Sequence, residues 1–286
     1  MEAAFSELPL ALFTTLAPIG AGAFAALAIA FFAAPFTGEQ LKRIDRMTLV
    51  PLAVVIVGFA ASFFHLASPS HAPFVFAHAG SSPLSNEILV GSIFVVLAVV
   101  YTALALAGKL SGGVRKGFAA VVAAAALVFA CFTGLAYVMD TIASWNSPLV
   151  PVQMLGFALV GGMALGTLAL GLAEALPAAL KSPFKQIGAV VSVAGAVLAV
   201  VGLCGQAALA GGLANPITAG ADLVAAALPW IVVSVACLVL ACAANVAALW
   251  GRNPVVLAAT ASAACVVGVF VARLAFYALQ LSVGLA

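Results

Sequence analysis

The chain has 286 residues, of which 66% are hydrophobic and only 6% are charged. A soluble domain carries about 25% charged residues, so the composition excludes a soluble globular protein and indicates a polytopic membrane protein surrounded by lipid. The net charge of +2 is too small to indicate a nucleic-acid partner.

Eight apolar runs are long enough to cross a bilayer, for which a helix needs about 20 residues. In sequence order they are Pro9–Ala34, Met47–Ala67, Leu84–Gly108, Phe118–Met139, Val150–Ala173, Ile187–Ala210, Leu223–Trp250 and Pro254–Val283. The predicted fold class is therefore all-α: a polytopic membrane helix bundle of eight transmembrane helices that forms one domain over residues 1–286. The first residues lack the basic segment and cleavage site of a signal peptide, so we expect the first helix to be retained.

Lysine and arginine gather in alternate connections between these runs. The first, third, fifth and seventh connections hold the basic residues Lys42, Arg43, Arg46, Lys109, Arg115, Lys116, Lys181, Lys185 and Arg252. Short basic connections stay cytoplasmic, so we expect both termini on the outer side of a bacterial cytoplasmic (inner) membrane. An even number of spanning helices satisfies this arrangement.

Four ionisable side chains are predicted to lie near the outer surface. His65 ends the second helix, Glu87 begins the third just over one turn after an N-cap at Ser82 and Pro83, and Asp140 ends the fourth. Arg273 lies in the outer half of the eighth helix.

Arg273 is the one basic residue expected at bilayer depth, where a charge costs at least about 2.5–3.5 kcal/mol. We interpret it as a functional residue rather than one that snorkels to the interface. Tyr277 and Gln280 follow on the same helical face. The inner half of the membrane is expected to hold no comparable set, with Asn245 as its most polar residue.

These outer residues suit the oxidation of a quinol, which releases two protons with its two electrons. A histidine accepts or donates a proton near neutrality. His65 could bind one quinol hydroxyl, and Glu87 could pass the proton to water. The small face of Gly58, Ala61 and Ser62 on the second helix leaves room for a flat ring, whereas Gly162 and Gly166 are interpreted as helix packing.

Metal cofactors fit this sequence less well. Only His65 of the three histidines lies in a predicted helix, which disfavours a b-type haem, and His71 and His78 are interpreted as loop residues. No cysteine or second carboxylate is spaced to complete a zinc site. The five cysteines fall in apolar runs and are interpreted as core residues, not iron–sulfur ligands.

Several motifs resemble the membrane anchor subunit family of dimethyl sulfoxide reductase. They are FHLASP at 64–69, LSNEI at 84–88 and GSIF at 91–94, with support from Asp140-Thr141, Trp145 and the glycines between 156 and 166. The resemblance implies an anchor without haem that oxidises menaquinol to menaquinone near the outer surface. Electrons would pass to an iron–sulfur electron-transfer subunit and then to a molybdopterin catalytic subunit. Both partners would dock on the outer face, and iron–sulfur clusters and molybdopterin would reside only in them.

The resemblance also implies a set of site residues. The family's quinol-site histidine and glutamate match His65 and Glu87, the expected catalytic pair. The expected quinol pocket comprises His65, Glu87, Ser62, Gly91, Arg273, Tyr277 and Asp140. No arginine precedes Asp140 where the family pattern has one, so Arg273 is expected to compensate. The segment 68–82 is interpreted as a docking surface and lid for the electron-accepting subunit.

Two other functions stay open from the sequence. A related quinone-linked anchor of the polysulfide-reductase type would share the general plan, and a secondary transporter would also be polytopic. Transporters place polar groups and broken helices near the midplane, whereas here the polar set lies at one edge. Whether the protein is itself catalytic or only an anchoring subunit of an oxidoreductase is likewise open.

Overall fold

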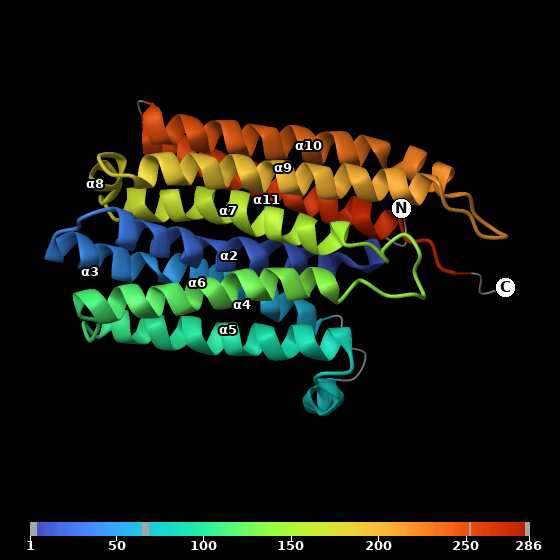
Figure 1. Ribbon diagram of the computed structural model, residues 1–286, viewed down its shortest axis with the longest axis horizontal. Coiled ribbons are helices and arrows are strands. Elements are labelled where there is room, and N and C mark those ends of the chain that lie inside the picture. Colours follow the sequence, from blue (N-terminus) through green and yellow to red (C-terminus); the bar gives the residue numbers. More distant parts are fainter. Residues whose placement is uncertain (1–4, 65–68, 252, 284–286) are drawn as a thin grey trace.

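The computed structural model of the protein describes residues 5–64, 69–251 and 253–283, and the regular elements among them are helices packed into one elongated bundle (Figure 1). The long helices are α2 (Leu8–Ala33), α4 (Leu49–Phe63), α5 (Pro83–Leu106), α6 (Gly112–Leu135), α7 (Leu149–Leu172), α9 (Phe184–Gly211), α10 (Gly220–Trp250) and α11 (Pro254–Ala278). The short helices are α3 (Gly38–Met47), α8 (Leu176–Leu180) and the 3₁₀ helix η1 (Pro69–His78). Within the described residues, eight helical spans are long and apolar enough to cross a membrane, with α3 and α4 forming one of them. The predicted all-α class and helix count are confirmed.

Helices α2 and α7 form the centre of the bundle (Figure 1). Most of each helix is buried, whereas the six surrounding spans expose much of their apolar surface. In a bilayer such exposed valine, leucine and phenylalanine side chains contact lipid instead of water. Side chains in the centre contact other helices and side chains at the periphery contact lipid, so both groups are apolar. This explains why nearly the whole sequence is apolar.

Close packing between α2 and α7 depends on glycine. A Cβ atom on Gly22 would lie 1.8 Å from the carbonyl oxygen of Ala158, and one on Gly162 would lie 2.2 Å from the carbonyl carbon of Gly22. Gly166 similarly faces Ala26 of α2. The interpretation of Gly162 and Gly166 as helix packing is confirmed, because small residues let membrane helices approach closely.

Several predicted boundaries differ from the structure, among them the end of the eighth span, which lies at Ala278 instead of Val283. The first basic connection is partly helical, because Thr37 and Gln40 form a reciprocal capping box that starts α3. The fourth span begins at Gly112 and ends at Leu135, about a turn and a half before the predicted start and one turn before the predicted end. Apolar composition alone misplaced these ends because helix α6 includes the basic residues Arg115 and Lys116.

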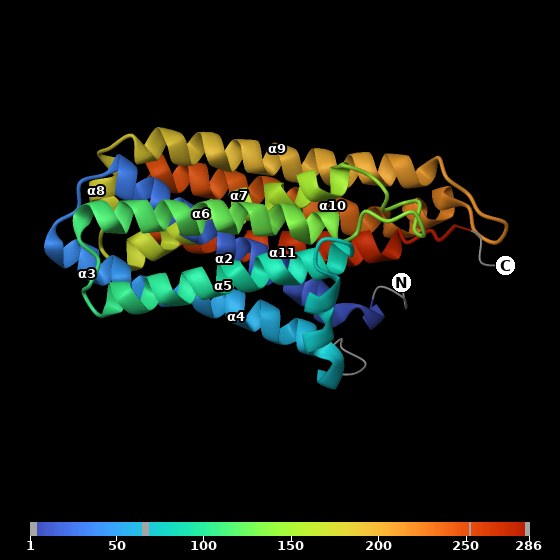
Figure 2. The same cartoon turned by 60° about the horizontal axis from the view of Figure 1, so that its bottom comes forward.

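Both termini point to the same end of the bundle, and η1 projects from that end (Figures 1 and 2). Helix α3 and the connections that carry Lys109 and Lys181 lie at the opposite end. The basic connections and the termini therefore lie at opposite ends of the bundle, as expected. The basic connections predict that the end with the termini faces outward, and this orientation stays a prediction.

The expectation that the inner half holds no set comparable to the outer one overlooked a buried ion pair at the basic end of the bundle. Asp45 of α3 and Arg115 of α6 form a buried ion pair at that end. The pair was missed because both residues belong to segments that the sequence suggested were solvated connections. Asn245, the residue expected to be most polar there, donates a hydrogen bond of 2.8 Å to the hydroxyl of Ser192.

Candidate functional site

Glu87 is buried in the first turns of α5, at the end of the bundle that holds the termini. The predicted N-terminus of this helix is confirmed, since Ser82 is its N-cap and Pro83 its first residue. The preceding turn is fixed by Asn86, whose side-chain oxygen accepts a hydrogen bond of 2.6 Å from the amide of Gly80. Gly80 has φ +90°, a conformation that glycine adopts without steric cost. This local geometry sets where Glu87 enters the bundle.

Arg273 is fully buried near the end of α11 and does not extend to the interface. Its Nε donates to the hydroxyl of Thr14 on α2 over 2.8 Å, and its Nη2 donates to the hydroxyl of Tyr277 over 3.2 Å. The Arg273 charge also interacts electrostatically with the Glu87 carboxyl. A buried arginine held by hydrogen bonds from two helices supports the functional interpretation over the snorkelling one.

Aromatic rings surround the Arg273 guanidinium. Its carbon lies 3.8 Å from the ring centroid of Phe276, 4.8 Å from that of Tyr137 and 5.0 Å from that of Tyr277. Trp145 stacks on Phe276 with centroids 4.8 Å apart, and its indole nitrogen donates to the Phe276 carbonyl. The ring faces attract the buried cation and hold it in one orientation.

Tyr137 links this group to the connection between α6 and α7. Its hydroxyl lies 2.6 Å from the Tyr277 hydroxyl, within hydrogen-bond distance. Burial raises the pKa of Tyr137 well above its ordinary value, with the neighbouring Tyr277 adding to the effect. A tyrosine phenol is protonated at neutral pH, so Tyr137 can donate a hydrogen bond.

Two atoms of the cluster are buried without a hydrogen-bond partner. They are Oε1 of Glu87, an acceptor when ionised, and Nη1 of Arg273, a donor. Thr133 of α6 lies beside the Glu87 carboxyl, but its hydroxyl already donates to the Phe129 carbonyl. Leaving a buried polar atom unpaired costs about 1–3 kcal/mol. Such atoms of opposite type in one cluster are suited to a ligand that carries a hydroxyl group.

An aromatic layer lies next to Glu87, one helical turn further along α5. A Cβ atom on Gly91 would approach Phe59 and Phe129 to within 2.9 and 3.0 Å. Phe129 stacks on Phe59 with centroids 5.5 Å apart and on Phe94 with centroids 5.6 Å apart. The missing side chain of Gly91 thus leaves space for Phe59 and Phe129. Gly91, which was predicted to line the quinol pocket, therefore lies in the aromatic layer next to Glu87.

The remaining predicted pocket residues lie elsewhere or outside the described residues. Asp140 is exposed and its carboxylate accepts a hydrogen bond of 2.8 Å from Asn146. The hydroxyl of Ser62 donates to the Phe59 carbonyl of its own helix, and the nearby Gly58 packs against Ala17 of α2. The structure therefore gives no open ring-sized face at Gly58. His65 lies outside the described residues.

Three residues of the buried cluster were not predicted: Thr14, Thr133 and Tyr137. Thr14 precedes a second threonine in an otherwise apolar run, and Tyr137 lies in the last residues of an apolar run, so neither has a distinctive motif. A search for polar residues within two turns of those ends of the predicted spans that lie on the side of the termini would have found all of them. That these three residues lie at the same distance along the bundle axis is visible only in the packed structure.

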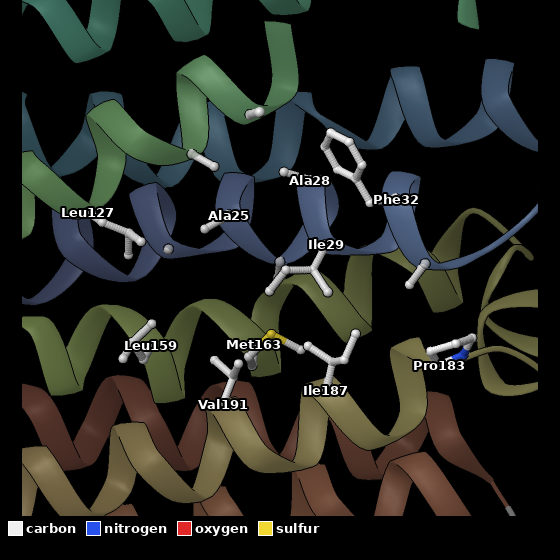
Figure 3. Close-up of a pocket in the computed structure, with 15 residues that line it drawn as sticks. Ala25, Ala28, Ile29, Phe32, Leu127, Leu159, Met163, Pro183, Ile187 and Val191 are labelled. Atoms are coloured by element: carbon white, nitrogen blue, oxygen red, sulfur yellow. The ribbon is translucent and has the colours of Figure 1, made fainter. Parts of the chain in front are cut away.

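A separate apolar groove of about 690 Å³ lies between α2, α6, α7 and α9 (Figure 3). Ile29, Phe32, Met163 and Ile187 line it together with small residues of α2. None of its lining side chains is ionisable. The groove cannot carry out proton chemistry, so the cluster around Glu87 and Arg273 is the candidate functional site.

Comparison with known proteins identifies a family that matches most of this chain. The sequence model of the family described as "DMSO reductase anchor subunit (DmsC)" matches residues 1–279. One polypeptide of the anaerobic dimethyl sulfoxide reductase of Escherichia coli K12 is 32% identical over 174 residues, which are 60% of this protein and 61% of the relative. The polypeptide of the same name from Haemophilus influenzae is 31% identical over 165 residues, which are 58% of this protein and 59% of the relative. The match thus spans less than two thirds of the length of these curated relatives.

Proposed function

The chain belongs to the DMSO reductase anchor subunit family, and from this premise we propose that it oxidises menaquinol at the cluster of Glu87 and Arg273. It is a multi-pass membrane protein by its eight apolar spans and its family. The observation that carries the proposal is the pair of buried unpartnered atoms, Glu87 Oε1 and Arg273 Nη1. An acceptor and a donor together match the two hydrogen-bonding roles of a quinol hydroxyl.

Menaquinol supplies two electrons and two protons when it is oxidised to menaquinone. Arg273 Nη1 donates a hydrogen bond to the quinol oxygen and stabilises negative charge that develops there as the proton leaves. Glu87 accepts that proton at Oε1, releases it to water at the near surface, and then takes and releases the second proton in the same way. Thr14 and Tyr277 act as positioning residues because they hold the other guanidinium nitrogens of Arg273.

We place the electron acceptor in a partner subunit, because the family is one of anchor subunits of a reductase. An iron–sulfur subunit would take the electrons and pass them to a molybdopterin catalytic subunit. Helix η1 supports docking at this end, because it stands out from the bundle next to the start of α5 and exposes Phe74 and Phe76 (Figure 2). With the termini outward, these partners would lie on the outer face of the inner membrane.

The proposal is tested by Arg273→Lys in the assembled complex. Lysine keeps the positive charge but lacks the planar fork that reaches Thr14, Tyr277 and the quinol together. Loss of one hydrogen bond from a charged donor costs about 1.5–3 kcal/mol, so kcat/KM for quinol should fall about ten- to a hundredfold. Turnover with an artificial electron donor to the partner subunits should stay unchanged. Unaltered quinol turnover would refute the role of Arg273; Arg43→Lys, at the opposite end of the bundle, is the control.

His65→Ala addresses the residue that matches the family's histidine and that lies outside the described residues. If His65 binds a quinol hydroxyl, its removal should abolish quinol-dependent electron delivery and leave the artificial-donor activity intact. The assay is quinol oxidation by inverted vesicles that contain the complex. Persistence of quinol turnover at the wild-type rate would remove His65 from the site and leave Glu87 as the sole proton acceptor.

A further inference from the structure

A second buried charged group lies at the basic end of the bundle, far from Glu87 and Arg273 (Figure 1). Arg115 of α6 pairs with both carboxylate oxygens of Asp45, and its Nη2 lies 3.0 Å from Oδ2. The side chains are only 8% and 5% exposed. Nη2 also contacts the Leu110 carbonyl, while Nε is buried without a partner. A buried pair of this kind fixes the start of α6 against α3.

A cavity of about 440 Å³ adjoins this pair. Its walls are α3, the C-terminal end of α5 and Arg115 of α6. The charged lining residues are Lys42, Asp45, Arg46 and Arg115. Three cations and one carboxylate leave an excess of two positive charges, and Asp45 is already engaged by Arg115. The positive charge of Lys42 and Arg46 is therefore not neutralised within the lining.

Lys42 and Arg46 lie one turn apart on α3 and both are exposed. Lys42 makes an ion pair of 2.8 Å with Glu39, in which both side chains are at least 70% exposed. An exposed pair of this kind contributes less than about 1 kcal/mol, so Lys42 can exchange this partner for another anion. Two neighbouring cations at a cavity mouth form a suitable binding site for a phosphate group.

The same cavity has an apolar side. Leu41, Leu106 and two alanines at the C-terminal end of α5 form this apolar part of its lining. Leu106 is exposed, as are Leu49 and Ile56 of the neighbouring helix α4. An amphiphile could therefore place its anionic group in the cavity and its hydrocarbon tails along α4 and α5. A free anion would leave this hydrocarbon surface unused.

We propose that the cavity between α3, α5 and α6 binds the phosphate headgroup of an anionic phospholipid, with Lys42 and Arg46 as its contacts. Basic pockets between membrane helices on the cytoplasmic side are suited to anionic headgroups. The bound lipid joins the amphipathic helix α3 to the ends of α5 and α6. It thereby stabilises the end of the bundle opposite the quinol site, and the proposal does not depend on quinol oxidation.

The test measures thermal unfolding of the full-length purified protein after removal of native lipid. Phosphatidylglycerol should raise the melting temperature more than an equal concentration of phosphatidylcholine does. In the double variant Lys42→Gln/Arg46→Gln, the apparent affinity for phosphatidylglycerol should fall about ten- to thirtyfold, because each basic residue near a membrane surface contributes about a fivefold factor. Lys181→Gln, an exposed lysine at the same end but outside the cavity, should keep the wild-type affinity.

Three outcomes would overturn the proposal. Equal stabilisation by phosphatidylcholine would show that headgroup charge is irrelevant, and an unchanged affinity in the double variant would exclude Lys42 and Arg46. Equal stabilisation by millimolar inorganic phosphate would identify a site for a free anion instead of a lipid. Native mass spectrometry of the same samples gives the lipid stoichiometry and keeps the test decisive if the variant is less stable.

Discussion

Replacement of Glu87 by glutamine is expected to reduce quinol-dependent turnover about a hundredfold or more, since a positioned acid–base group contributes about 10²- to 10⁴-fold. Glutamine has nearly the same shape, so the aromatic layer and the start of α5 should be preserved. It cannot accept a proton at the position of Oε1, the atom that the structure leaves without a partner. The loss should appear mainly in kcat, because the amide can still hydrogen-bond a quinol hydroxyl and hold it in place.

The matched control for Glu87→Gln is Asp222→Asn. Asp222 is an exposed carboxylate in the first turn of α10, at the same end of the bundle. Its replacement removes one negative charge from that end without touching the cluster. If both variants lost activity equally, surface charge and not a proton acceptor would explain the effect. If Glu87→Gln oxidised quinol at the wild-type rate, the proposed proton acceptor would be wrong.

Gly22→Ala adds a single methyl group, and among the substitutions considered it is expected to lower the stability of the protein most. The added methyl carbon would lie 1.8 Å from the Ala158 carbonyl oxygen, a backbone atom that cannot move away without shifting α7. Overpacking of a well-packed core costs about 1–3 kcal/mol and sometimes more, and we expect the upper end here. Thermal unfolding of the purified protein and its yield in the membrane are the measurements.

Gly117→Ala provides the control for that substitution. Gly117 lies in the exposed first turns of α6, and a Cβ atom there would meet nothing within 4 Å. Alanine favours a helix over glycine by about 1 kcal/mol, so this variant should be as stable as the wild type or slightly more so. If the Gly22→Ala and Gly117→Ala proteins had the same melting temperature, the tight α2–α7 contact would be disproved.

Part of the candidate site was predictable because each residue carried its own signal. Glu87 interrupts an apolar run just after an N-cap, and Arg273 is a charge within a span. Tyr277 follows Arg273 by four residues, and their predicted shared face is confirmed by a hydrogen bond of 3.2 Å. Asp140 was grouped with them only because its predicted depth in the membrane was the same. Depth alone does not tell whether a side chain is buried in the bundle, and Asp140 is exposed.

The other members of the cluster needed the fold. Thr14 and Arg273 are separated by 259 positions, and Tyr137 and Tyr277 by 140. Threonine and tyrosine are common in membrane helices facing any direction, so their type gave no indication of a site. The buried pair of Asp45 and Arg115 was missed for a related reason. A charged residue near a span end usually reaches water, and only the buried ion pair between α3 and α6 shows that these two do not.

The sequence by itself determined the membrane class, the eight spans, the common end of the termini and the two charged residues on which the proposed quinol site depends. These properties follow from local composition, since a bilayer requires about 20 apolar residues per helix and makes each buried charge conspicuous. Only the tertiary structure decided which helices are central, which polar side chains join Glu87 and Arg273, and which of their atoms lack partners. Those features depend on the rotation of each helix about its axis. In a protein that is apolar on nearly all helix faces, that rotation is set by close glycine contacts such as Gly22 against Ala158, and not by any hydrophobic periodicity.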